Sequence, residues 1–197
     1  YSRAVRGEIN TSSAPHGLYL DATRKRLFIN NFLARSVSVQ DVATVLTAKT
    51  NTATYLQTVS TVAVEPMEAQ ALRGKQVFYN AADRRMSKDN YMSCASCHAD
   101  AGDDGMVWDF TQRGEGLRRT INLMARQGLG HGRVHWTANF DEIQDFENDI
   151  RSGFGGTGFL SDADFAATSD PLGTLKAGKN EQLDDLAAYL TSLDKTM

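Results

Sequence analysis

Five consecutive residues, Cys94-Ala95-Ser96-Cys97-His98, constrain this chain more than any other part of its sequence. They contain both cysteines that the chain has. A bridge between cysteines so close together favours a reactive role over a structural staple between distant segments. The adjacent histidine adds an imidazole, a common ligand of metal ions in proteins.

The pattern C-x-x-C-H is typical of covalent haem attachment, in which the two thiols bond to the porphyrin vinyl groups and the imidazole binds the iron. A thioredoxin-like redox site would need a βαβ setting, which the flanking sequence does not supply. A zinc site would need further cysteines or histidines at ligand spacing, and the other three histidines are not a paired set near the motif. We therefore predict one haem c, bound through Cys94 and Cys97 and ligated by His98.

Composition sets limits on the rest of the molecule. Hydrophobic residues make up 41% and charged residues 23% of the 197 residues, which is typical of a globular chain. The net charge of −3, with no basic stripe, argues against a nucleic-acid partner. No apolar run approaches the roughly 20 residues of a membrane span. The chain starts at Tyr1 without an initiator methionine, and we expect it to be a processed product or part of a longer protein.

Two regions of different character meet near Glu65-Pro66. Residues 1–65 are expected to be β-rich, with strands at 18–20, 26–30 and 36–39 and a further candidate at 59–64. Residues 66–197 show helical spacing of apolar residues at 71–81, 140–150 and 183–193. Asn180 is a suitable N-cap for the last helix, and glycines at 155, 156 and 158 predict a loop. The predicted fold is a mainly α haem domain preceded by a β-rich segment.

The sixth iron ligand has several candidates. His131 and His135 lie in a glycine-rich loop downstream of the motif, and we expect one of them to bind the iron. Met124 is the alternative thioether ligand, and Met197 is the only later methionine. An open sixth position would instead permit oxygen or peroxide chemistry.

Charged residues are unevenly distributed after the motif. Five arginines occur between 113 and 133, and Arg118 and Arg119 are the first candidates to pair with the haem propionates, which need such partners near a protein interior. Acidic residues dominate from Asp141 to Asp170. This acidic stretch is expected either to steer a basic redox partner or to be an ordinary exposed helix surface.

Residues 1–65 contain a pattern that resembles one blade of a YVTN-type β-propeller. The matching residues are Pro15, Gly17, Leu27-Phe28-Ile29-Asn30, Val37-Ser38-Val39 and Asp41. A blade cannot bury its faces alone. The resemblance therefore implies neighbouring blades, from a longer precursor or from a partner chain, whereas the alternative is a small sheet packed on the second region.

The second region resembles two groups of haem proteins. Gly74 and Phe78, together with residues 186–193, are similar to the N- and C-terminal helices that cross beside the haem of class I cytochromes c. Glycine permits a close helix approach, and Phe78 and Tyr189 would fill the remaining space.

The segment between Phe78 and Phe159 resembles a haem domain of the bacterial di-haem cytochrome c peroxidase and MauG family. The resemblance lies in Arg118-Arg119-Thr120-Ile121-Asn122-Leu123 and in His135-Trp136-Thr137-Ala138-Asn139-Phe140. It departs from the family at Ile121, where the family has proline, and at Thr137-Ala138, where it has Asp-Gly. The chain also has one haem motif where the family has two.

Together, the motif and these resemblances imply a periplasmic c-type cytochrome that passes electrons to a redox partner protein. The alternative is a haem subunit of a peroxidase-like or oxidase-like, MauG-related enzyme. A mainly structural role of the haem is a third possibility.

Overall fold

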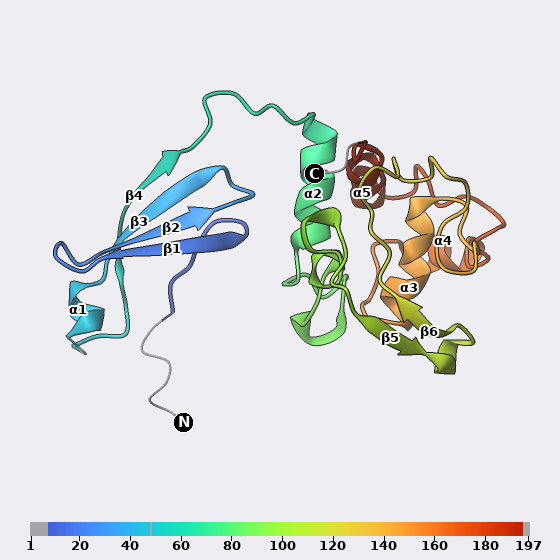
Figure 1. Ribbon diagram of the computed structural model, residues 1–197, viewed down its shortest axis with the longest axis horizontal. Helices are drawn as coiled ribbons and strands as arrows, with labels where there is room; N and C mark the ends of the chain where they lie inside the picture. Colours follow the sequence, from blue (N-terminus) through green and yellow to red (C-terminus); the bar gives the residue numbers. More distant parts are fainter. Residues whose placement is uncertain (1–7, 48, 195–197) are drawn as a thin grey trace. The chain divides into compact units, whose positions relative to one another are not determined.

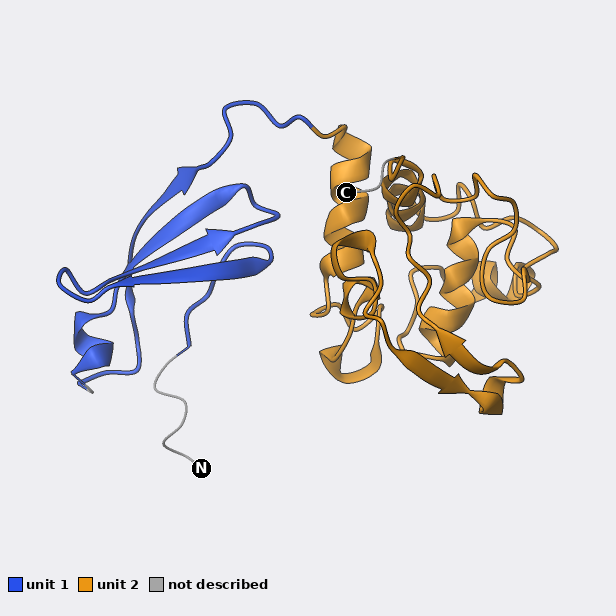
Figure 2. Ribbon diagram, in the orientation of Figure 1, with its two compact units in different colours: residues 1–66 blue, residues 67–197 orange. Residues whose placement is uncertain are grey.

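Two units divide the chain after Pro66, one comprising residues 1–66 and the other residues 67–197 (Figure 2). The computed structural model describes residues 8–47 and 49–194. Within these residues, no helix combines the length and the apolar character needed to cross a membrane.

The N-terminal unit is a four-stranded antiparallel sheet in which each strand pairs with the next along the chain (Figure 1). Its elements are β1 (Pro15–Asp21), β2 (Arg26–Asn31), β3 (Ser36–Asp41), the short helix α1 (Ala43–Leu46) and β4 (Thr54–Ser60). The three strands predicted first are confirmed. The fourth begins at Thr54, so the predicted strand at 59–64 overlaps only its end.

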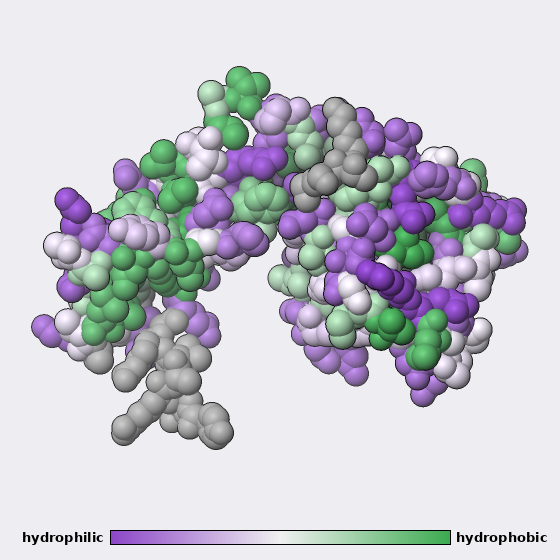
Figure 3. Space-filling view, viewed as in Figure 1, coloured by the Kyte–Doolittle hydropathy of each residue, from purple (hydrophilic) through white to green (hydrophobic). Residues whose placement is uncertain are grey.

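The sheet buries its two central strands and exposes its two edge strands. Ile29 and Val39 are buried in β2 and β3, and the buried Asn31 donates hydrogen bonds to Ser36 and Ser38. Every residue of β4 is exposed, and so is almost all of β1. Leu18, in β1, is 72% exposed. Hydrophobic residues therefore lie on the surface of this unit, where Figure 3 shows them gathered over the sheet.

The second unit begins and ends with the two longest helices, α2 (Ala69–Tyr79) and α5 (Glu181–Thr191). Each begins at a side-chain cap. The Glu68 carboxylate accepts from the amides of Gln70 and Ala71, and Asn180 accepts from those of Gln182 and Leu183. Both helices confirm the predicted ones, as does the predicted Asn180 cap.

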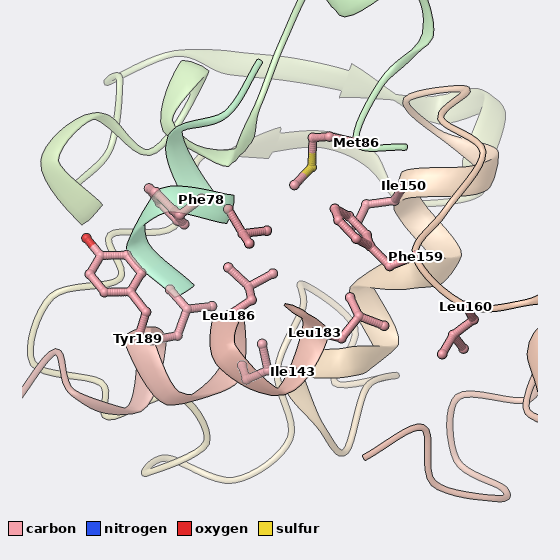
Figure 4. Packing of buried hydrophobic residues seen from close by; sticks show 11 residues of the cluster. Phe78, Met86, Ile143, Ile150, Phe159, Leu160, Leu183, Leu186 and Tyr189 are labelled. Atoms are coloured by element: carbon pink, nitrogen blue, oxygen red, sulfur yellow. The ribbon is translucent and has the colours of Figure 1, made fainter. Parts of the chain in front are cut away.

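Helices α2 and α5 cross at Gly74. A Cβ atom at this position would overlap the carbonyl group of Asp185 and would lie 2.8 Å from Tyr189 Cβ. One turn later, the rings of Phe78 and Tyr189 meet edge to face with centroids 5.2 Å apart. The expected close approach at Gly74, with Phe78 and Tyr189 filling the space, is therefore confirmed. These rings belong to the core shown in Figure 4, which also contains Met86, Ile143, Ile150, Phe159, Leu160, Leu183 and Leu186.

Between these helices the chain forms many short elements. They are the 3-10 turns η1 (Lys88–Asn90), η2 (Cys94–Ser96), η3 (Ala99–Ala101), η4 (Thr111–Arg113) and η5 (Ile143–Asp145), the hairpin strands β5 (Val107–Phe110) and β6 (Gly116–Arg119), and helices α3 (Phe146–Ser152) and α4 (Asp162–Ala167). The helix predicted at 140–150 is therefore shorter than expected and starts later, as η5 followed by α3.

The prediction of a mainly α haem domain preceded by a β-rich segment is wrong. The fold is mixed α/β, with 29% helix, 20% strand and two small sheets. One reason is the antiparallel pair of β5 and β6, whose alternation is too short to stand out in the sequence. A second reason is that much of the second unit lies outside the helices and strands.

The acidic run that begins at Asp141 corrects another expectation, because much of it lies inside the protein. Glu142, Asp145, Glu147 and Asp149 are all buried. Glu147, which is 0% exposed, accepts hydrogen bonds from the amides of Phe159 and Leu160 and from Arg151 Nε. The Glu147 carboxylate therefore anchors to α3 the end of the loop that contains Gly155, Gly156 and Gly158. The prediction that the acidic stretch forms an exposed surface is therefore wrong for these four residues.

The other buried carboxylates have equally specific partners. The Lys176 side chain, also 0% exposed, donates from Nζ to Asp145 over 2.6 Å. Glu142 accepts from the amides of Lys176 and Ala177. Because each buried charge is paired or hydrogen-bonded, the cost of removing it from water is offset.

Candidate haem site

The two cysteines and His98 extend from a single turn of the chain. In η2, the amides of Cys97 and His98 both donate to the carbonyl of Cys94, over 3.3 and 3.0 Å. Ser93 caps the turn, and its amide donates to Ser96 Oγ over 3.0 Å. The turn therefore fixes the spacing of the two thiols and the imidazole through the backbone.

The turn formed by residues 93–98, which we call the ligand turn, packs against the hydrophobic core of the second unit. Cys94 and Ala95 contact the hydrophobic cluster of α2 and α5, and both cysteines are free and partly buried. Burial raises the pKa of the Cys94 thiol to about 12, and it also raises that of Cys97. At neutral pH both thiols are therefore protonated.

The imidazole of His98 is oriented by the backbone. Its Nδ1 atom lies 3.3 Å from the carbonyl oxygen of Gly102. Burial lowers the pKa of His98, while hydrogen bonds to the backbone of Gly102 and Ile121 oppose this effect. The ring is therefore neutral at neutral pH. A neutral imidazole that donates from one nitrogen to a carbonyl is the usual state of a histidine that binds a metal through the other.

Residues 120–124 run beside the ligand turn. The amide of Leu123 donates to the carbonyl of Ala101 over 2.9 Å, and the backbone of Ile121 bonds to the His98 ring. Leu123, Leu129 and Val134 are partly buried and pack against the same core. Met124, the alternative sixth ligand, is partly buried in this segment, and its amide donates to Asn122 Oδ1.

The residues around the turn suit a haem c. They supply two thiols, a neutral histidine and, in Leu123, an apolar side chain that packs against the same core as Cys94. Arg118 adds a buried Nε atom to which no described residue offers a hydrogen-bond acceptor. A carboxylate such as a haem propionate is the kind of group that would satisfy it. Arg119, the other predicted propionate partner, is 68% exposed and lies 3.6 Å from Asp103.

The two histidines predicted as sixth ligands have very different surroundings. His131 is exposed in its loop. The side chain of His135 is only 5% exposed and has acidic neighbours on both nitrogens, with Glu115 3.2 Å from Nδ1 and Asp149 3.3 Å from Nε2. Asn139 Oδ1 also lies 2.9 Å from Nδ1. As placed, His135 has no nitrogen free for iron. Met197 lies outside the described residues.

His135 belongs to a buried polar cluster that the sequence did not reveal. Asp149 also pairs with Arg113, which lies over the Phe110 ring at the edge of a shallow pocket. That pocket is lined by Asp109, Phe110, Gln112, Arg113, Gly153 and Phe154.

The partners of His98 were also missed. Gly102 and Ile121 bond to the His98 ring through backbone atoms, so the identity of their side chains gives no sign of this role. Among the described residues, no group of three or more His, Cys, Asp or Glu side chains is arranged to hold a metal ion by itself.

Comparison with known protein families, with curated proteins and with solved structures finds no match to this chain.

Proposed function

We propose that this chain is a c-type haem protein that transfers electrons through one covalently bound haem. The observation that supports this most is that Cys94, Cys97 and His98 extend from one capped turn, with Nδ1 of His98 directed at the Gly102 carbonyl. In this proposal Nε2 of His98 would bind the iron, as is usual for a histidine whose Nδ1 faces a carbonyl.

Each residue has a defined task in this proposal. Cys94 and Cys97 anchor the group through thioether bonds, and His98 is its axial ligand. The Gly102 carbonyl keeps the proton on Nδ1 and so fixes the tautomer of His98. Arg118 offers its unpartnered Nε to a propionate. The bound haem supplies the one-electron iron couple.

The sixth position separates the carrier from the enzyme alternative. His131 is the better candidate for it, because both nitrogens of His135 have acidic neighbours. Ligation by a second imidazole blocks the iron and favours electron transfer. If neither His131 nor the alternative ligand Met124 binds, the position is open, and the peroxidase-like or oxidase-like function becomes the better proposal.

We further propose a periplasmic location, since haem c attachment needs thiols kept reduced within an oxidising compartment. The partner would be a redox protein. For the N-terminal sheet we propose neighbouring blades from a longer precursor or a partner chain. The exposure of β1 and β4 supports this, because both edges carry unpaired backbone groups and apolar side chains.

Mass spectrometry of the denatured chain tests the central proposal. The chain is produced with a haem c attachment system, and wild type should carry the mass of one haem. Cys94→Ala and Cys97→Ala should lose the double thioether link. Ser96→Thr is the matched control, because it changes a residue of the same turn but keeps both thiols and the hydroxyl that accepts from the Ser93 amide. A wild-type chain without bound haem would contradict the proposal.

A spectrum of the same preparation tests the carrier against the enzyme. Low-spin iron that does not respond to cyanide or peroxide is expected for the carrier, and His131→Gly should convert it to high spin. High-spin wild-type iron would favour the enzyme instead.

A further inference from the structure

Asp104 is held in place beside the ligand turn by donors from three residues. Its carboxylate accepts from the Met106 amide over 2.9 Å and from Trp108 Nε1 over 3.1 Å. It also bonds to the side chain of Thr120, which shares the Trp108 indole over 3.1 Å. The carboxylate is thus fixed between the start of β5 and the end of β6.

The chain connects this carboxylate to His98 from two directions. Gly102, whose carbonyl faces His98 Nδ1, lies two residues before Asp104. Thr120 is followed directly by Ile121, whose backbone bonds to the His98 ring. Asp104 is therefore tied, through Gly102 on one side and Thr120 on the other, to both backbone groups that face the His98 ring.

Asp104 differs from its neighbour Asp103 in how its charge is balanced. Asp103 has the guanidinium of Arg119 at 3.6 Å. No lysine or arginine in the described part of the chain forms an ion pair with Asp104, which is held by neutral donors. Burial alone would raise the pKa of Asp104, but the hydrogen bonds from Thr120, Met106 and Trp108 outweigh it and lower the pKa. The carboxylate is therefore ionised at neutral pH.

We propose that Asp104 lowers the reduction potential of the iron ligated by His98, through a fixed negative charge beside the ligand turn. This inference rests on the proposed function. A negative charge near the iron stabilises the oxidised form, which carries one more positive charge, more than the reduced form. Because Asp104 is only partly buried, salt weakens the effect.

Redox titration of the holoprotein is the first test. In Asp104→Asn the potential should rise, so that the ratio of reduced to oxidised protein at a fixed ambient potential increases by roughly threefold or more. Asp104→Glu keeps the charge but alters the hydrogen bonds, and it should stay close to wild type. Asp109→Asn is the matched control, because Asp109 lies exposed on the same hairpin and bonds only to Thr111.

Two results overturn the inference. One is a wild-type potential in Asp104→Asn with an unchanged spectrum. The other is an equal shift in Asp104→Glu or Asp109→Asn, which would point to structure rather than to this charge.

A second measurement separates this inference from the proposed function. In a Cys94→Ala chain produced without a haem-attachment system, Cys97 should be alkylated faster at a fixed pH when Asp104→Asn is added. Faster alkylation in a protein that never attaches haem would leave the charge effect intact and contradict the proposed function. Haem attachment with no effect of Asp104→Asn on the potential or on the alkylation rate would support the proposed function and contradict the role of Asp104.

Discussion

His135 is a buried histidine whose protonation is favoured by the acidic groups next to its ring. Burial alone would lower its pKa, but hydrogen bonds to Asp149 and Asn139 and the charges of Asp149 and Glu115 raise it above the usual 6.5. When protonated, the ring links its loop to α3 through the Asp149 carboxylate. Its stacking on Phe140, with ring centroids 4.8 Å apart, fixes the ring in this position.

Stability should therefore depend on pH through this residue. A group whose pKa is raised by folding stabilises the native state fully below its unfolded pKa, here 6.5, and this contribution is lost as pH rises through the folded value. Urea unfolding should show a declining free energy of unfolding above pH 6.5. His135→Gln should flatten this decline, whereas His131→Gln, exposed in the same loop, should keep it. An unchanged slope in His135→Gln would contradict the assignment.

Single residues also show what a sequence can and cannot tell about a site. Cys94, Cys97 and His98 can be proposed as one site from the sequence because they lie within five consecutive residues, and the structure places them at one turn. The surroundings of His135 were not, because the carboxylates that occupy its nitrogens come from positions 115 and 149. A histidine in a glycine-rich loop has the same local sequence whether its ring faces a metal or two acids.

At the scale of elements, the crossing of α2 and α5 supports the ligand turn. Cys94 and Ala95 lie against the core that these helices form, so the spacing of the two helix axes bears on the site. Gly74 sets that spacing, because a side chain there would meet the backbone at Asp185.

Gly74→Ala should therefore destabilise the protein although alanine favours helix. Relief of the clash requires the helices to separate, at a cost of about 1–3 kcal/mol, which exceeds the helix-propensity gain of about 1 kcal/mol. Gln76→Ala, exposed on the same helix, is the control and should be nearly neutral. Chemical denaturation measures both. Equal or higher stability of Gly74→Ala would show that the crossing can relax.

Elements with local signals were predictable, and those that depend on distant partners were not. Turn residues mark β1, β2 and β3, and side-chain caps with a 3–4 spacing mark α2 and α5. Four acidic residues between 142 and 149 suggest a solvated surface, as charges usually do. Their burial depends on Lys176, Arg113 and the amides of residues 159–160, which are distant in the sequence.

For the molecule as a whole, the free thiols make maturation sensitive to redox conditions. Cys94 and Cys97 lie in one turn and are close enough in sequence to oxidise with each other, which under the proposed function would compete with haem attachment. Expression in an oxidising compartment without a haem-attachment system should give a haem-free chain with a Cys94–Cys97 disulfide.

Intact mass measures this directly, as the loss of the two thiol hydrogens, and reduction should restore them. Cys97→Ser supplies the control, because it leaves no partner for Cys94. Normal covalent haem content in a preparation that lacks the attachment machinery would contradict the proposed route of maturation.

The buried pair of Lys176 and Asp145 also limits how this sequence can change during evolution. Replacing either residue alone leaves the other charge buried without a partner, which lowers the free energy of unfolding by about 3–5 kcal/mol. The whole stability margin of a domain is only about 5–15 kcal/mol. Substitutions at Asp145 and Lys176 should therefore occur together during evolution, although thirty residues of chain separate the two positions. Descendants of this protein should keep both or exchange both, so that a lineage with one substituted will carry a compensating change at the other.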